Sequence, residues 1–368
     1  MVLFENIQRY SKDPAQYCEQ VFDYYQRSDR EDIQRIRNIL NSWFEGYPDE
    51  EKSELLSRFK KTFYDCFYEL FIYTLFKSLG FEIEIHPTVP DSLKRPDFLI
   101  KKQDLEIYIE AKSVNGLSLK EEAFKRFVNQ FYDYLNKVRI KGHVLHLVKL
   151  DFKTQNQPST KKIIKHLETE ANILISREAI DDEVITYDTP DIYLVVKLLP
   201  LRDKSKIYAD RPIGIHPIEL YYGGGEEYIR NAIIDKGKRY GRLDKPFIIC
   251  INAIDGKVNG QDDIESAIWG SIAMAYQEGV EDSSKLIHLE NGVFYSNKKG
   301  RLKNLSGVFV SQVFPHNIDN AYYYLCQHPL SDNKLDFSQL GLEYWNIGND
   351  NMKNCVEGKS IGELLKKI

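Results

Sequence analysis

The stretch Arg95-Pro96-Asp97-Phe98-Leu99-Ile100 is followed, after a short polar turn, by Leu105-Glu106-Ile107-Tyr108-Ile109-Glu110-Ala111-Lys112. The second segment alternates between apolar and polar residues with the two-residue period of a β-strand, so Glu110 and Lys112 are expected on the same face. The first segment is typical of a preceding strand, and two strands joined by a short turn form a hairpin. We therefore expect this hairpin to bring Asp97 beside Glu110 and Lys112.

Two carboxylates and a lysine in one place are suited to binding Mg²⁺ and a phosphodiester. Mg²⁺ prefers oxygen ligands and is usually held by one or two carboxylates together with substrate phosphates. The pattern therefore predicts Asp97 and Glu110 as metal ligands and the backbone carbonyl of Ala111 as a further oxygen ligand. Lys112 is predicted to orient the attacking water or to neutralise the phosphate. The alternative is a surface hairpin in which a Glu and a Lys pair on a solvated face.

The elements around this hairpin follow an order that resembles the PD-(D/E)xK nuclease superfamily, whose members have the restriction-endonuclease-like fold. The resemblance covers roughly residues 60–151. It implies an α/β fold with an αβββαβ core, a mixed sheet flanked by helices, and Mg²⁺-dependent hydrolysis of phosphodiesters. Besides the hairpin strands, the matching elements are a helix at 68–80 that ends at Gly80, a strand at 81–85, a helix at 119–138 and a strand at 143–150.

Two further residues are candidates for the site. Glu69 lies in a helix that is apolar nearly all round, where a lone acid is costly to bury unless it is paired or near a cation. The resemblance implies that a glutamate here reaches the metal, and the alternative is a partly exposed acid near Lys77 or Tyr73. Gln130 and Tyr134 are one helical turn apart, and such a Gln-x-x-x-Tyr pair marks the exonuclease-like branch of the superfamily. The alternative, which we favour for Tyr134, is that these residues merely flank the apolar stripe of their helix.

Composition restricts the class of protein. No apolar run approaches the ~20 residues needed to cross a bilayer, so no membrane partner is expected. The five cysteines are scattered and form no Cys-x-x-Cys motif, which indicates neither a disulfide framework nor a zinc site. Glu5 lies where a secretion signal would carry basic residues, and we therefore expect a cytoplasmic protein.

The net charge of −5 does not by itself indicate a nucleic-acid-binding protein. Basic residues nevertheless cluster near the hairpin and in the helix and loop that follow it, where they could contact a phosphate backbone. We therefore expect a nucleic acid, and specifically DNA, as the partner. The residues of these clusters are Lys94, Arg95, Lys101, Lys102, Lys120, Lys125, Arg126, Lys137, Arg139 and Lys141.

The length of 368 residues predicts about two domains. We expect an N-terminal helical region at 1–58, a nuclease core at 59–200, and a C-terminal α/β region at 201–368 that serves substrate selection or assembly. Two basic-aromatic segments of that last region, Lys236–Arg242 and Lys298–Lys303, are candidates for contact with a phosphate backbone.

These observations predict a metal-dependent endo- or exonuclease that uses Mg²⁺, with Mn²⁺ as a substitute. The resemblance implies a role in restriction, phage defence or repair, and the sequence does not choose among them. Cleavage of both strands by two coordinated cuts would suggest a homodimer. One alternative is a catalytically silent protein of nuclease fold that binds nucleic acid or a partner. Another is a structural α/β protein in which the motif has arisen by accident.

Overall fold

The computed structural model describes residues 1–90, 92–180, 183–217, 224–254, 256–258, 260–275, 285–296, 299–348 and 353–365. The chain forms two compact units. Unit 1 contains Met1–Gln8, Arg30–Gly116 and Tyr222–Ile368, and unit 2 contains Arg9–Asp29 and Leu117–Tyr221. Most of unit 2 is therefore an insertion between two parts of unit 1. Among the described residues, no helix is both long and apolar enough to cross a membrane.

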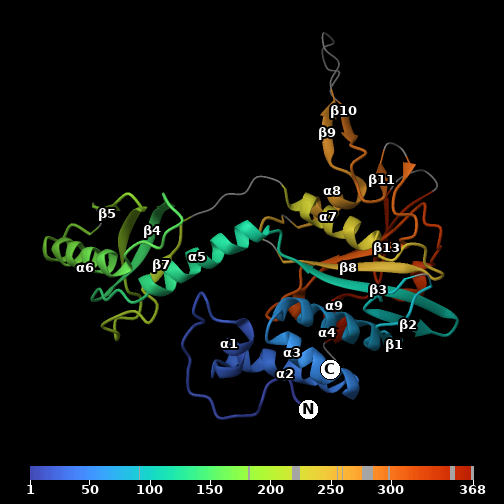
Figure 1. Cartoon of the computed structure of the whole chain (residues 1–368), viewed down its shortest axis with the longest axis horizontal. Helices are drawn as coiled ribbons and strands as arrows, with labels where there is room; N and C mark the ends of the chain where they lie inside the picture. The colour runs from blue at the N-terminus through green and yellow to red at the C-terminus, as the bar shows by residue number, and fades with distance from the viewer. Residues whose placement is uncertain are drawn as a thin grey trace, which may run out of the picture. The chain divides into compact units, whose positions relative to one another are not determined.

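Unit 1 is built on a mixed eight-stranded sheet (Figure 1), in the order β1-β2-β3-β8-β13-β14-β15-β16. β1, β2 and β3 are antiparallel neighbours, whereas β8 runs parallel to both β3 and β13. The strands are β1 (Glu82–Ile85), β2 (Phe98–Lys102), β3 (Leu105–Val114), β8 (Phe247–Ala253), β13 (Gly307–Ser311), β14 (Tyr323–Gln327), β15 (Tyr344–Ile347) and β16 (Lys353–Val356).

Helices cover both faces of this sheet (Figure 1): α7 and α8 lie on one face, and α4 and α9 lie on the other. On the first face, Ile229 and Ile233 of α7 share an apolar core with Ile249 and Ile251 of β8. Burying apolar surface on both faces stabilises a central strand such as β8, and all seven of its residues are buried. The helices of unit 1 are α2 (Glu31–Glu45), α3 (Asp49–Phe59), α4 (Phe63–Ser78), α7 (Gly225–Gly237), α8 (Gln261–Trp269) and α9 (Ile361–Leu365), with 3₁₀ turns at Ile318–Asn320 and Phe337–Leu340.

α4 is buried on nearly all sides because it packs between the sheet and the helices α2 and α3. An amphipathic helix would leave one side exposed, whereas a helix that is apolar all round needs neighbours on every side. Tyr73 of α4 contacts Phe98 of β2, with ring centroids 6.1 Å apart. The helix stops just before Gly80, whose φ of +83° is the left-handed conformation that glycine adopts readily.

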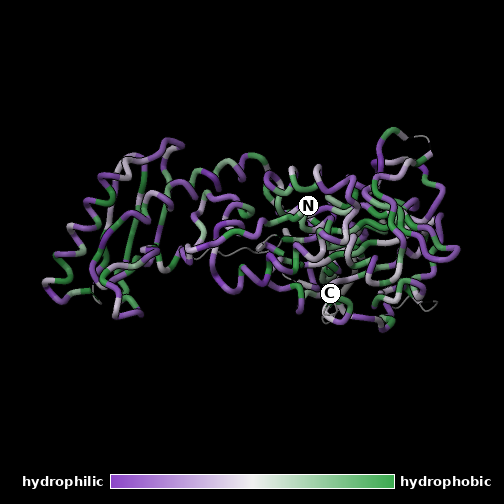
Figure 2. Tube along the Cα trace, turned by 90° about the horizontal axis from the view of Figure 1, so that it is seen from below, coloured by the Kyte–Doolittle hydropathy of each residue, from purple (hydrophilic) through white to green (hydrophobic). Residues whose placement is uncertain are grey.

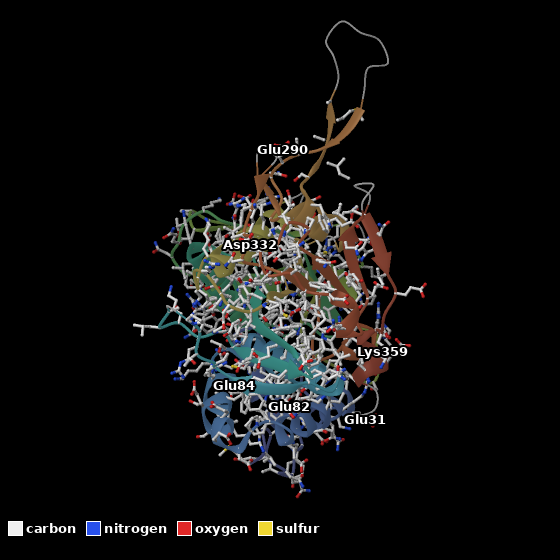
Figure 3. All side chains as sticks on the ribbon, turned by 90° about the vertical axis from the view of Figure 1, so that its right-hand side faces the viewer. Glu31, Glu82, Glu84, Glu290, Asp332 and Lys359 are labelled. Carbon is white, nitrogen blue, oxygen red and sulfur yellow. The ribbon has the colours of Figure 1, made fainter. Side chains whose placement is uncertain are left out.

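Charged side chains line the free edge of the sheet at β1. Glu82 and Glu84 are both exposed there (Figure 3), and Glu84 pairs with Lys101 of β2 at 2.9 Å. Charges on an edge strand disfavour pairing with a strand of another chain. Two further antiparallel ribbons belong to unit 1: β9 (Ile272–Ala275) with β10 (Lys285–His288), and β11 (Tyr295–Ser296) with β12 (Lys299–Gly300).

Unit 2 has its own four-stranded sheet, in the order β5-β6-β4-β7, and its own apolar core. Figure 2 shows the apolar residues of unit 1 concentrated along its central strands. In unit 2 the core lies between the sheet and the helices α5 and α6. The elements of unit 2 are α1 (Val21–Arg27), α5 (Leu119–Leu135), β4 (His143–Phe152), α6 (Thr160–Ser176), β5 (Ile185–Asp188), β6 (Ile192–Pro200) and β7 (Ile213–Ile215).

The expected mixed α/β class, with a large mixed sheet flanked by helices, is confirmed. The expected place of two elements is wrong: the helix at 119–138 and the strand at 143–150 exist as α5 and β4, but β4 belongs to the separate sheet of unit 2. The strand beside β3 is β8, where Glu110 is opposite Ile249. Periodicity identifies a strand but not its partner, and β4 and β8 are both apolar enough to fill that position.

The compact units also differ from the expected division at residues 58 and 200. The segment 9–29 belongs to unit 2, and residues after 222 complete the sheet that begins at β1. Pairing between β3 and β8 spans the whole insertion, and no local change of composition announces such a long-range contact.

Candidate active site

The hairpin of β2 and β3 fixes Asp97 beside Glu110. The two strands pair in antiparallel register, with Phe98 opposite Ile109. Asp97 immediately precedes β2, and its Oδ2 accepts a hydrogen bond of 2.7 Å from the backbone N–H of Ala111. The structure therefore brings together the two carboxylates that the sequence pattern singled out.

Glu110 is buried, with a side chain only 1% exposed, and it is surrounded by donors. Its Oε1 accepts hydrogen bonds from Lys236 Nζ and, at 3.2 Å, from Arg239 Nη1. Its Oε2 accepts one from the hydroxyl of Tyr240, which also lies 3.1 Å from the carbonyl oxygen of Arg95. All three donors come from the end of α7 and the turn that follows it.

The two neighbouring carboxyl groups influence each other. Burial, and secondly the negative charge of Glu110, raise the pKa of Asp97 from its ordinary 3.8 to about 7. The N–H of Ala111 and the cations Lys236 and Arg58 act in the opposite direction. Burial and Glu110 also raise the pKa of Tyr240, which keeps its hydroxyl protonated as a donor. The arrangement holds two acids in a place where positive charge is favoured.

Lys112 makes its contact with a different helix. Its Nζ donates to both carboxylate oxygens of Asp65, each at 3.0 Å, and both side chains are about 40% exposed. Asp65 belongs to the first turn of α4. Asp65 could not be selected from the sequence, because an acid in a first helical turn is usually explained by the helix dipole.

Glu69 has partners that account for its burial. It forms an ion pair with Arg58 of α3 and accepts a hydrogen bond of 3.2 Å from the hydroxyl of Tyr47. A buried acid needs a partner or a nearby cation, and Arg58 is both for Glu69. A role for Glu69 at a metal stays a prediction that these contacts do not require.

Gln130 is in unit 2, on α5, where its Oε1 accepts a hydrogen bond of 3.4 Å from Gln157. The helix that supplies side chains to Glu110 is instead α7. Lys236 and Tyr240, which are themselves four residues apart, contact Glu110. Among the described residues, the structure thus places Gln130, a predicted site residue, in the other unit.

The segment Lys236–Arg242 was selected from the sequence for substrate contact, and the structure shows that part of it surrounds Glu110. The expected role of residues 201–368 in substrate selection or assembly stays a prediction, and the same region also supplies side chains that contact the motif. The second basic-aromatic segment, Lys298–Lys303, begins outside the described residues.

The candidate metal ligands of this site are all oxygen atoms. Within the described ranges, no three His, Cys, Asp or Glu side chains gather in the way that a metal-binding cluster does. Mg²⁺ does not require such a cluster, because one or two carboxylates are its usual protein ligands. Asp97 and Glu110 are such a pair, and the carbonyl of Ala111 stays the predicted third oxygen.

The chain matches no family model, no curated protein and no solved structure. A functional conclusion for this chain therefore depends on the chemistry of Asp97, Glu110, Lys112 and their neighbours.

Proposed function

We propose that this chain is a metal-dependent nuclease of the PD-(D/E)xK type, which hydrolyses phosphodiester bonds with DNA as its substrate. The observation that carries the proposal is the fixed position of Asp97 beside the buried Glu110, through the N–H of Ala111. Lys112 follows two residues later on the same strand. This is the set of residues that the motif requires, on the predicted hairpin.

The order of elements in unit 1 supports the same proposal. With unit 2 treated as an insertion, the chain runs α4, β1, β2, β3, α7 and β8, and β8 pairs parallel to β3. This order is the αβββαβ core that the resemblance implies. The insertion separates β3 from α7, and for this reason the sequence pattern alone selected α5 and β4 instead.

The side chains fit a divalent cation. Two adjacent carboxylates, of which Glu110 is buried and Asp97 partly buried, repel each other, and a cation between them relieves that repulsion. Lys236 and Arg239 show that positive groups are attracted to Glu110. Asp97 and Glu110 would hold Mg²⁺, with the carbonyl of Ala111 as a further ligand. When bound, the ion would polarise the scissile phosphate and lower the pKa of a water molecule.

The protein side chains have separate tasks in this proposal. Lys112 neutralises charge that develops on the phosphate. Asp65 orients Lys112, because both of its carboxylate oxygens accept hydrogen bonds from the Lys112 ammonium group. Tyr240 holds one oxygen of Glu110 in place through a hydroxyl that stays protonated. Arg239, whose side chain is 40% exposed, can contact both Glu110 and a phosphate at the surface.

A second candidate is a catalytically silent protein of nuclease fold that binds nucleic acid or a partner. The motif side chains already have partners within the protein, and this favours the silent candidate. Glu110 accepts hydrogen bonds from three side chains, and Lys112 is paired with Asp65. In this alternative the cluster only stabilises the fold.

A cleavage assay separates the two candidates. The purified chain is incubated with supercoiled plasmid, single-stranded DNA and RNA, in Mg²⁺, Mn²⁺, Ca²⁺ or excess EDTA. We expect cleavage of DNA in Mg²⁺ and Mn²⁺ and none in EDTA. Ca²⁺ should support binding without turnover, because its looser coordination positions water less strictly. Full activity in EDTA would contradict metal dependence, and binding without cleavage in every metal would establish the silent alternative.

A further inference from the structure

One face of α5 lines a groove of unit 2 with a cavity volume of about 1110 Å³. The opposite wall consists of the segment from Ser11 to Gln20, with Arg27, Asp210 and Arg211 nearby. The residues of α5 that face the groove are three or four positions apart, so they form one stripe along the helix. They are Arg126, Asn129, Gln130, Asp133 and Tyr134, and Asn136 and Lys137 line the groove just after the end of the helix.

The carboxylates of this groove are already engaged within unit 2. Asp133 accepts hydrogen bonds from the backbone N–H groups of Tyr17 at 2.7 Å and Cys18 at 2.8 Å, so it anchors the opposite wall. Glu19 pairs with Arg27, with an Oε2 to Nη2 distance of 2.8 Å. Asp210 pairs with Lys206.

The last carboxylate, Asp13, accepts a hydrogen bond of 3.2 Å from the hydroxyl of Ser11. Every acid that lines the groove therefore has a donor from the protein.

Three of the four cations that line the groove, in contrast to the paired Arg27, have donors available for a ligand. Within the described residues, Arg126, Lys137 and Arg211 form no ion pair, and the Nε of Arg211 is buried without an acceptor. Arg211 lies over the ring of Tyr17, 4.0 Å from its centroid, and Lys137 lies over the ring of Tyr134 at 4.9 Å. A groove with spare donors and engaged acids is suited to an anionic ligand.

We propose that this groove binds a single strand of nucleic acid. Arg126 lies on α5, and Lys137 follows two residues after the last residue of that helix, Leu135. The helix alone rises roughly 14 Å from Arg126 to Leu135, which is longer than one phosphate group. Between them the ring of Tyr134 is 38% exposed and can stack on an unpaired base. Gln130 is exposed beside it and can bond to a base edge.

The choice of a single strand follows from the aromatic ring, because the bases of a duplex are stacked on each other and not free to stack on protein. The inference rests on the proposed nuclease function in one respect, which is the identification of the anionic ligand as a nucleic acid. The contacts that carry it lie in unit 2, and those that carry the nuclease proposal lie in unit 1.

Fluorescence anisotropy with a labelled oligothymidine of about 20 nucleotides tests the inference, in EDTA so that cleavage does not interfere. The test variant is Arg126→Gln/Lys137→Gln. The matched control is Arg202→Gln/Lys204→Gln, which removes two exposed cations of the same unit that do not line the groove. We expect the test variant to bind about tenfold more weakly and its log–log salt slope to fall by about 1.4, since each phosphate contact on a single strand contributes ~0.7.

The control should keep the affinity and slope of the original chain. Equal effects in both variants, or none in either, would overturn the inference. Equal competition by inorganic phosphate or by a duplex of the same length would overturn the assignment to a single strand.

A further variant, Tyr134→Ala, keeps the test available if the double variant fails to fold. It should weaken binding about fivefold or more without changing the salt slope, because stacking involves no counterion release. Cleavage in Mg²⁺ is measured separately with the same variants. If the variants keep both cleavage and binding, the groove proposal is contradicted and the nuclease proposal stands. If binding depends on the groove residues but no cleavage occurs, the nuclease proposal is contradicted and the groove proposal stands.

Discussion

At the scale of single residues, Glu110 shows how a buried charge is kept in a folded protein. A carboxylate this deeply buried is stable only if its oxygens are hydrogen-bonded and its charge is balanced. Lys236 and Arg239 balance the charge, and Tyr240 bonds to the remaining oxygen. The same cations would oppose a divalent ion at Glu110, so the account requires the lysine to give way when a metal binds.

This requirement gives a prediction for Lys236→Gln. A hydrogen bond between charged groups contributes about 1.5–3 kcal/mol, so removing the competing lysine should tighten metal binding roughly tenfold or more. Binding of Mn²⁺ is measured by calorimetry or by electron paramagnetic resonance, without reference to activity. Lys238→Gln, at an exposed lysine two residues away, is the control and should bind Mn²⁺ as the original chain does. Identical affinities in the two variants would show that Lys236 has only a structural role.

The raised pKa of Asp97 gives a prediction about pH. Its pKa is about 7 in the folded state and 3.8 ordinarily, so the folded state holds a proton that the unfolded state has released between those values. Stability in EDTA should therefore fall as pH rises from about 4 to about 7, by up to ~4 kcal/mol from this group.

The variant Asp97→Asn removes this dependence and should be more stable than the original chain at pH 8, as measured by chemical denaturation. Asp332→Asn, at an exposed acid of the same unit (Figure 3), should leave the pH dependence unchanged. A less stable Asp97→Asn protein at pH 8 would contradict the raised pKa.

At the scale of elements, α4 carries two acids one turn apart that have different partners. Asp65 pairs with Lys112 of β3, whereas Glu69 pairs with Arg58 of α3 and with Tyr47. The helix thus supports the motif strand with one acid and joins the N-terminal helices with the other.

We predict that Glu69→Ala destabilises unit 1 by about 2 kcal/mol, because it leaves Arg58 and Tyr47 without their acceptor. The effect is smaller than for a fully buried pair, since the Arg58 side chain is 34% exposed. Denaturant unfolding gives the stability, and cleavage per folded molecule should persist. The control is Glu54→Ala, because Glu54 lies 3.9 Å from the same arginine but is 65% exposed. Loss of cleavage at unchanged stability would instead support the role of Glu69 at a metal.

The local part of the site could be predicted from the sequence. The alternation of Glu106 to Lys112 predicts a strand, and the polar turn before it predicts the hairpin that carries Asp97. Asp65 and Lys236 could not be found in this way, because each reaches the motif only through tertiary packing, and Lys236 is 126 residues from Glu110. A helix that ends in basic residues also has an ordinary explanation in its dipole, which concealed the role of α7.

At the scale of the whole molecule, the insertion of unit 2 is what the sequence did not reveal. Its helices and strands have the same periodicity as those of unit 1, so α5 and β4 seemed to continue the motif. The sheet of unit 1 continues past β3 with β8, which lies beyond the insertion in the sequence. A central strand is stabilised where both of its faces become buried. A single sequence shows which segments are apolar, but it does not show which of them pair.

The central claim is that the motif hairpin is a catalytic site, and the cleavage rate of Lys112→Ala tests it most directly. The rate of DNA cleavage in Mg²⁺ at saturating DNA, where a change in DNA affinity has no effect, is compared among the original chain, Lys112→Ala and Lys101→Ala, with folding verified by circular dichroism. Lys101 is a lysine of the same hairpin that pairs with Glu84 at the sheet edge. The account predicts a loss of about 10²-fold or more for Lys112→Ala, because a preorganised charge at the phosphate is removed, and an unchanged rate for Lys101→Ala. A well-folded Lys112→Ala protein that cleaves as fast as the original chain would contradict the claim.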